Sequence, residues 1–224
     1  MLFGQSWYNT DWQYRVPVTI YNSGSELSDY QVKVELGSSF DWNHTNADGS
    51  DIRFVTADGT VMPYYFEAWN PLSSSALIWV KVPVVAAGTT TIFIYYGNEF
   101  APTVESGDAT FEFYDGFTGT ALDVTKWRIR RSGWSISVGS GMLTMVSESL
   151  TQWARIDGYA TFGLGYMIEA RAAHPNHNTL NMIMEVGFTN PEITNTVRIV
   201  DDFGSTGYWQ RQSKISTTSG DPIV

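Results

Sequence analysis

Hydrophobic and polar residues alternate along most of the chain. A period of two is typical of β-strands that bury one face, whereas a helix needs apolar residues three and four positions apart. The alternation is clearest at residues 31–36, 134–138, 166–172 and 180–188. Residues 76–80 and 92–96 are apolar at consecutive positions, which predicts strands that are buried on both faces. The chain is therefore expected to be almost entirely β.

Short turn signals separate these segments about every ten residues. Among them are Asn22-Ser23-Gly24, Asp48-Gly49, Asp58-Gly59, Ala87-Gly88, Gly139-Ser140-Gly141 and Asp157-Gly158. Glycine after Asp or Ser favours a turn because it adopts backbone conformations that other residues avoid. Many short strands with closely spaced turns indicate β-sandwiches.

A boundary between two domains is expected after the apolar segment 92–96. Residues 101–107 have no periodic apolar face, so we interpret them as a short linker. The predicted fold is all-β, with two β-sandwich (jelly-roll or lectin-like) domains in tandem. The first would cover residues 1–100 and the second residues 108–224.

Charge and composition exclude several classes of protein. Lys and Arg number 13 against 23 Asp and Glu, which gives a net charge of −10 and argues against nucleic-acid binding. In the basic cluster Arg128-Ile129-Arg130-Arg131, a strand would place Arg128 and Arg130 on one face and Arg131 on the other. The sequence contains no run of eighteen apolar residues, so membrane insertion is not expected. The absence of cysteine excludes thiol catalysis and disulfides.

The first half resembles a known family. The resemblance is carried, in order, by Trp12-Gln13-Tyr14-Arg15-Val16-Pro17-Val18-Thr19-Ile20, Asp51-Ile52-Arg53-Phe54, Asp58-Gly59, Pro63-Tyr64-Tyr65, Trp69, Trp79-Val80-Lys81-Val82-Pro83 and Tyr95-Tyr96-Gly97-Asn98. The family is the domain of unknown function numbered 2341, found on extracellular and multidomain proteins of microbes. The resemblance covers about residues 7–98. It implies a β-sandwich module and brings no established catalytic residues.

The second half is similar to the beginning of a concanavalin A-like lectin or laminin-G-type sandwich. The similarity is carried by Phe113-Tyr114-Asp115-Gly116-Phe117, Leu122-Asp123, Lys126-Trp127, Gly141-Met142-Leu143 and residues 162–171. Such sandwiches usually need more chain than residues 108–224 provide. The resemblance therefore implies a sheet completed by further chain or by a strand from a neighbouring subunit.

Catalytic arrangements are not evident. Concanavalin-like glycosidases place two carboxylates on one strand so that both flank the glycosidic bond. Residues 181–186 carry only Glu185, and Glu169 lies alone in its own segment. There is no Gly-x-Ser-x-Gly elbow. We therefore predict that the chain is not an enzyme.

Few residues are candidates for a metal site. His174 and His177 are three positions apart, but Pro175 breaks any helix that would align them. Calcium prefers carboxylate oxygens, so short acidic turns are candidate sites. Most such turns, however, bind no metal. The candidate calcium ligands are Asp48, Asp51, Asp201 and Asp202. No other cofactor is expected.

Tryptophan side chains are the candidates for ligand binding. An exposed indole can stack on the flat apolar face of a sugar ring, although packing in the core is the commoner role of any one aromatic ring. The candidates lie beside turns or polar residues, and they are Trp7, Trp12, Trp42, Trp69, Trp153 and Trp209. By their positions, Trp79, Trp127 and Trp134 fit a core.

Three functions remain open. The first is a structural or adhesive surface module with glycan-recognition capacity, in a virion (decoration or tail) or a cell-surface assembly, whose partners are a glycan or surface polymer and neighbouring subunits. The second is a carbohydrate-binding module of a secreted polysaccharide-degrading enzyme. The third is a glycoside hydrolase or lyase with an unrecognised site. Residues 1–6 lack the pattern of a secretory signal. The expected location is extracellular, on a cell surface or on a virion surface.

Overall fold

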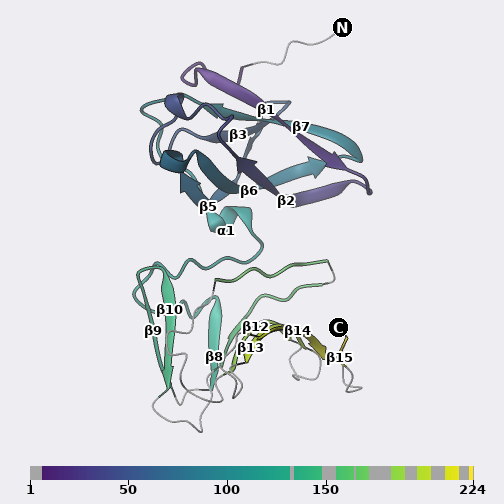
Figure 1. Cartoon of the computed structure of the whole chain (residues 1–224), viewed down its shortest axis with the longest axis vertical. Coiled ribbons are helices and arrows are strands. Elements are labelled where there is room, and N and C mark those ends of the chain that lie inside the picture. The colour runs from purple at the N-terminus through teal and green to yellow at the C-terminus, as the bar shows by residue number, and fades with distance from the viewer. Residues whose placement is uncertain are drawn as a thin grey trace. The chain divides into compact units, whose positions relative to one another are not determined.

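The computed structural model describes residues 7–131, 134–147, 155–163, 165–171, 183–189, 196–202, 210–216 and 222–223. By their contacts, the residues divide into two compact units, Met1–Ala160 and Thr161–Val224, and each is considered by itself. Strands make up nearly all of the regular structure, so the predicted all-β class is confirmed (Figure 1). The predicted domain boundary at residues 100–108 falls inside the first unit, and it stays a prediction.

Two antiparallel sheets form the first part of unit 1. The four-stranded sheet has the order β1 (Tyr14–Asn22), β7 (Gly88–Tyr96), β3 (Arg53–Thr56) and β4 (Val61–Met62). The three-stranded sheet has the order β2 (Leu27–Leu36), β6 (Ser75–Val85) and β5 (Tyr64–Asn70). Two 3-10 turns, η1 (Trp42–His44) and η2 (Pro71–Ser73), lie in the connections.

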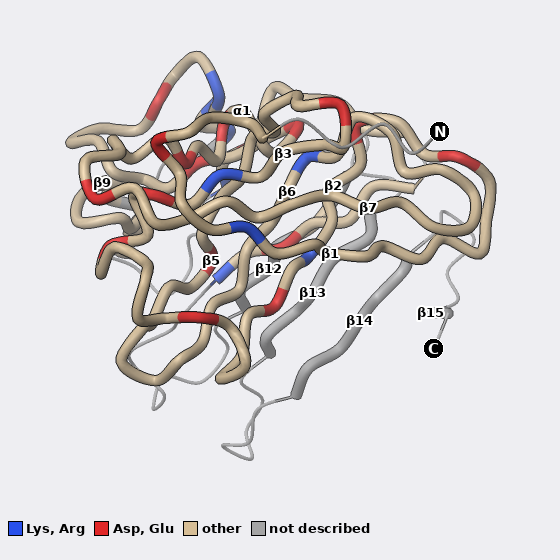
Figure 2. The backbone as a smooth tube through the Cα atoms, turned by 90° about the horizontal axis from the view of Figure 1, so that it is seen from above, with Lys and Arg blue, Asp and Glu red and all other residues tan. Residues whose placement is uncertain are grey.

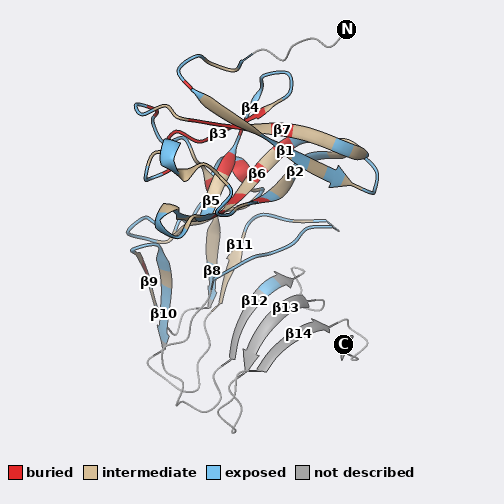
Figure 3. Cartoon of the chain, turned by 45° about the horizontal axis from the view of Figure 1, so that its top comes forward, coloured by how far each residue is buried: buried red, intermediate tan, exposed pale blue. Residues whose placement is uncertain are grey.

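One hydrophobic core joins the two sheets. Ile78, Val80 and Val82 of β6 and Ile92 and Ile94 of β7 are all buried in it. Along β6, Ile78, Val80 and Val82 alternate with more exposed neighbours. The period of two in the sequence therefore corresponds to one buried face of the strand. Buried residues gather on β3 and β6 (Figure 3). The arrangement is sandwich-like, as predicted for the first half.

The outer face of β7 is also covered. An arm of residues 7–12 packs Tyr8 and Trp12 against Tyr95, in a second cluster that includes Val55 and Ala101. Tyr95 is therefore as buried as the residues that face the main core. This arm is the physical reason why the segment 92–96 is apolar at consecutive positions.

Residues 106–114 are anchored to the three-stranded sheet, and the linker predicted at residues 101–107 stays a prediction. The amide of Ser106 donates to the carbonyl oxygen of Tyr64 at 2.8 Å, and the side chain of Gln31 donates to the carbonyl oxygen of Thr110 at 3.0 Å. Ser106 then caps the short helix α1 (Gly107–Thr110) by accepting from Ala109 at 3.2 Å.

The rest of unit 1 consists of two strand pairs. One pair is β8 (Trp127–Arg131) with β11 (Arg155–Gly158), and the other is β9 (Trp134–Gly139) with β10 (Met142–Ser147). Asp157-Gly158, expected to form a turn, instead ends β11. The predicted strand at residues 134–138 is confirmed, as are those at residues 31–36, 76–80 and 92–96.

Unit 2 contains one antiparallel sheet. Its order is β12 (Ile183–Thr189), β13 (Thr196–Asp202), β14 (Gln210–Ser216) and β15 (Pro222–Ile223). Residues 166–171 form no strand, contrary to the alternation in the sequence. Tyr166, Met167 and Ile168 are exposed there, so the apolar side chains of this segment do not form a buried face. A second sandwich, and its completion by further chain or by a neighbour, stay predictions.

Truncating a valine should be costly only on the core face of β6. Val80 is 0% exposed and Val84 is 49% exposed, on the same strand. Val80→Ala is expected to lower the free energy of unfolding by roughly 2 kcal/mol, because it removes two buried carbon atoms and leaves a cavity. Val84→Ala, the matched control, should cost less than about 0.5 kcal/mol. Urea unfolding measures both, and equal losses would contradict the assigned core.

Candidate functional site

A pocket of about 260 Å³ lies beside α1, in unit 1. Its lining consists of Asp108, Phe111, Glu112, Phe113, Tyr114, Thr125, Lys126, Tyr159 and Ala160. Pockets for drug-sized ligands are typically about 300–1,000 Å³. This pocket is therefore suited to a group the size of a single ring.

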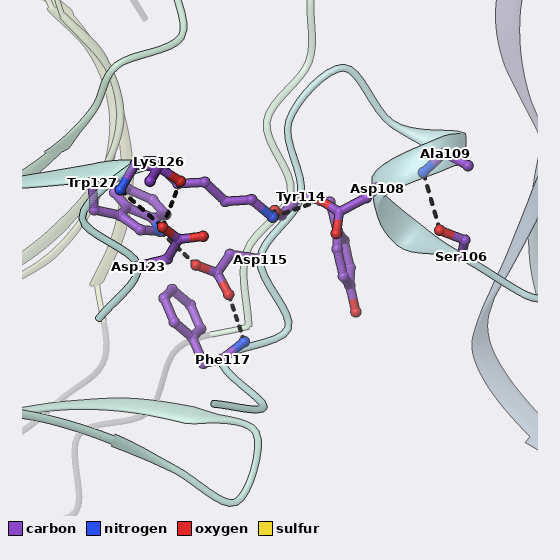
Figure 4. Close-up of polar contacts among 10 residues, drawn as sticks. Ser106, Asp108, Ala109, Tyr114, Asp115, Phe117, Asp123, Lys126 and Trp127 are labelled. Atoms are coloured by element: carbon purple, nitrogen blue, oxygen red, sulfur yellow. Dashed lines mark hydrogen bonds and ion pairs between the residues drawn. The ribbon is translucent and has the colours of Figure 1, made fainter. Parts of the chain in front are cut away.

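Lys126 supplies the positive charge of the pocket. Its Nζ donates to Asp108 Oδ1 at 2.6 Å and to the carbonyl oxygen of Tyr114 at 2.8 Å, and its side chain extends toward both (Figure 4). The hydrogen bond to Asp108 raises the pKa of Lys126, although partial burial opposes the rise. A lysine ammonium has three N–H donors, so one remains for a ligand.

Aromatic rings form one wall of the pocket and attach it to the sandwich. Phe111 and Tyr114 are stacked with an interplanar angle of 17°, and both contact Tyr65 of β5. A Cβ atom at Gly107 would lie 2.5 Å from the ring of Tyr114, so glycine permits this close approach. Burial raises the pKa of Tyr114, with a further contribution from the hydrogen bond to Tyr65, so the phenol stays protonated.

Asp115 fixes the position of β8 beside the pocket. It accepts from the indole Nε1 of Trp127 at 2.7 Å and from the amide of Phe117 at 2.8 Å (Figure 4). Phe113 and Phe117 pack against the ring of Trp127, at centroid distances of 4.9 and 5.9 Å. One face of β8 is therefore held by an aromatic cluster, which supports the predicted core role of Trp127.

The opposite face of β8 and β11 carries three arginines around one carboxylate. Asp157 Oδ2 accepts from Arg130 Nε at 2.9 Å, and its Oδ1 accepts from Arg155 Nε at 2.5 Å. Arg128 Nη2 lies 3.6 Å from the same carboxylate. Burial alone would raise the pKa of Asp157, but the hydrogen bonds and charges of Arg155 and Arg130 outweigh it and lower the pKa.

The predicted tryptophans do not form one platform in the described part of the chain. Trp7 and Trp12 lie on the outer face of the four-stranded sheet, and Trp42 and Trp69 contact each other at 5.2 Å beside the main core. Each of these four indoles donates its N–H to a backbone carbonyl, of Trp12, Asp51, Gly37 and Ala47 respectively. These contacts are typical of packing, and a ligand role stays a prediction. Trp153 and Trp209 lie outside the described residues.

The two candidate calcium ligands of unit 1 are engaged in hydrogen bonds within the chain. Asp48 accepts from the amide of Ser50 at 3.0 Å and so closes its own turn. Asp51 is fully buried and accepts from the amides of Asn46 and Gly97. Asp201 and Asp202 belong to β13, but their side chains lie outside the described part, as do His174 and His177. Within the described ranges, no three acidic or histidine side chains come together to hold a metal ion.

The pocket and the arginine face were not predicted from the sequence. Arg128 and Arg130 were correctly placed on one face of a strand, but Arg155 joins them from a segment 25 residues further along the chain. A signal was present in Arg155-Ile156-Asp157, whose alternation places Arg155 and Asp157 on one face of a strand. Because Asp157-Gly158 was interpreted only as a turn, the strand at residues 155–158 was not predicted.

Comparison with known proteins supports one family. Residues 48–130 match the sequence profile of the Domain of unknown function (DUF2341), which confirms the first resemblance in the sequence. The matched range starts later than the predicted 7–98 and continues through α1 to Arg130, so it includes Lys126 and part of the arginine face. Searches of curated proteins and of solved structures gave no match. Nothing supports a concanavalin A-like second domain.

Two further properties bear on partners. Acidic residues are spread widely over the described backbone, and basic residues occupy fewer places (Figure 2). None of the helical segments in the described part has the length and apolar character that a membrane-spanning helix requires.

The ion pairs of Asp157 generate a prediction about pH. The pKa of Asp157 is lower in the folded chain, so the carboxylate stabilises the fold fully above its usual pKa of 3.8, and this contribution is lost as pH falls through the lowered value. Asp157→Asn should reduce the free energy of unfolding at pH 7 by about 1–2 kcal/mol, because three arginines lose their counter-charge.

Urea unfolding at pH 7 and below pH 3.8 measures this effect. The difference in the free energy of unfolding between wild type and Asp157→Asn should be smaller at the lower pH. Asp11→Asn, at an exposed position of the arm, is the control and should leave stability nearly unchanged at both values. A gap that stays constant with pH would show that Asp157 acts through packing and not through its charge.

Proposed function

We propose that this chain is a non-catalytic surface module that recognises glycans, as part of a virion or of a cell-surface assembly. The observation that carries the proposal is the ring-sized pocket, which combines an exposed aromatic side chain with a lysine donor. Tyr159 is 54% exposed and lines the pocket together with Lys126. A sugar presents an apolar ring face and several hydroxyl groups, and these two side chains match both features.

The carboxylates of the pocket support binding over catalysis. A glycosidase needs one carboxyl group as acid and a second as base or nucleophile. Here Asp108 is paired with Lys126 at 2.6 Å, and Glu112 is paired with Lys81 at 2.9 Å. Each carboxylate is thus engaged by a lysine of the chain itself, so the pocket holds no pair of free carboxylates to flank a glycosidic bond.

The attachment of the pocket to the sandwich also suits a binding module. Phe111 contacts Tyr65 and Trp79, and Lys81 of β6 holds Glu112. The pocket residues are thus supported by strands of the sandwich, and rigid support limits the entropy lost when a ligand binds. The same site would serve a carbohydrate-binding module of a polysaccharide-degrading enzyme, and only the protein's native context separates that alternative.

Removing the ring of Tyr159 should weaken glycan binding. For a panel of soluble polysaccharides, Tyr159→Ala is expected to reduce the affinity of the purified chain about two- to tenfold, since one aromatic contact contributes roughly 0.5–1.5 kcal/mol. Tyr21→Ala is the matched control, because Tyr21 is 77% exposed on β1 and does not line the pocket. Isothermal titration calorimetry measures both variants.

Two results would contradict the proposal. The first is a folded wild-type chain that binds no polysaccharide in the panel. The second is the release of new reducing ends by the purified chain, which would favour a glycoside hydrolase.

A further inference from the structure

The arginine face of β8 and β11 has more positive charge than its own carboxylate can balance. Among the described residues, Arg128, Arg130 and Arg155 surround Asp157, which leaves an excess of two positive charges in this cluster. The whole chain has a net charge of −10, so this cluster is opposite in sign to the chain as a whole. A cluster that served only its own ion pairs would need fewer guanidinium groups.

The guanidinium groups retain capacity for a ligand. Arginine has five N–H donors, and the distances above engage only part of each group with Asp157. Arg128 Nε is buried and has no hydrogen-bond partner among the described residues. Arg128 and Arg130 are nonetheless 38% and 42% exposed, so an external anion can reach this face.

Tyr159 connects this face to the pocket. The guanidinium carbon of Arg128 lies 5.7 Å from the centre of the Tyr159 ring, and the same ring lines the pocket. The amide of Tyr159 donates to the carbonyl oxygen of Lys126 at 2.9 Å, which fixes Tyr159 beside the pocket's lysine. A ligand bound over Tyr159 would therefore have Lys126 and Arg128 as neighbours.

We infer that the ligand is an acidic glycan, whose sugar ring occupies the pocket over Tyr159 and whose carboxylate or sulfate group binds Arg128 and Arg130. The inference rests on the proposed glycan-binding function and names the class of ligand. Planar guanidinium groups bind both kinds of anion through paired hydrogen bonds.

A nucleic acid fits these observations less well than an acidic glycan. DNA carries a charge about every 1.7 Å, and it is usually bound by proteins with extended basic surfaces. Here the arginine cluster lies on one short strand pair of a chain whose net charge is −10. An acidic glycan with more widely spaced negative charges than DNA is repelled less by the acidic residues around the arginine face.

The test compares an uncharged polymer with two acidic ones, of which dextran sulfate has the same backbone as dextran. Binding of the whole chain is measured by isothermal titration calorimetry with dextran, dextran sulfate and polygalacturonate, and with single-stranded DNA as the alternative. Dextran sulfate, polygalacturonate or both should bind at least about tenfold more tightly than dextran, and the affinity should fall as salt rises. Which of the two binds identifies the sulfate or the carboxylate as the recognised group.

Arg130→Gln and Lys33→Gln form a matched pair of variants. Each removes one positive charge from a strand, and the side chains are 42% and 46% exposed. Arg130→Gln should weaken binding of the acidic glycan about tenfold, whereas Lys33→Gln should change it less than twofold. If circular dichroism shows that Arg130→Gln perturbs the fold, Arg128→Gln replaces it, with the same expected loss.

Each contrary outcome identifies which claim fails. If dextran and the acidic polymers bind equally, or if both variants lose affinity equally, the inference fails and glycan binding stands. If no glycan binds, the proposed function fails together with the inference. If single-stranded DNA binds more tightly than every glycan and Arg130→Gln removes that binding, the arginine face is a nucleic-acid site and the inference is wrong.

Discussion

The buried carboxylate of Asp51 is the interaction on which the first part of the chain depends. Its two oxygens accept from the amides of Asn46 at 2.9 Å and Gly97 at 2.7 Å, and its carbonyl oxygen accepts from the indole of Trp12 at 2.5 Å. Three segments far apart in sequence thus meet at one fully buried residue. A buried carboxylate is tolerated only when such partners replace water, and losing one of them would leave an uncompensated charge.

Arg53 extends this interaction toward the pocket. Its guanidinium group is buried, packs on the ring of Trp12 and donates to the carbonyl oxygen of Pro102 at 2.7 Å. The chain therefore leaves β7 in a fixed direction, and Ser106 then joins Tyr64 of β5. Because residues 101–106 are held in this way, α1 and the aromatic wall that follows it lie against the sandwich, and the pocket forms there.

Much of the fold of the first half could be predicted from the local pattern of apolar and polar residues, whereas the candidate site could not. Alternation correctly predicted the strand around Val32 to Leu36, because one buried face requires a period of two. The anchoring of residues 101–107 could not be predicted, because Arg53 and Tyr64 bind backbone groups of this segment and such contacts leave no apolar period in the sequence. The arginine face depends on the pairing of β8 with β11, which no local pattern specifies. Tyr166 to Ile168 shows the reverse, since its alternation produced no strand.

The inferred binding of an acidic glycan depends on Tyr159, Lys126 and Arg128 acting on one ligand. Hydrogen–deuterium exchange of the whole chain, with and without a bound acidic glycan, tests this claim most directly. The account predicts slower exchange in residues 126–130 and 155–159 and no change in β1 or in the arm of residues 7–12. Slower exchange confined to the arm, around Trp7 and Trp12, would contradict it and place the ligand on the tryptophans instead.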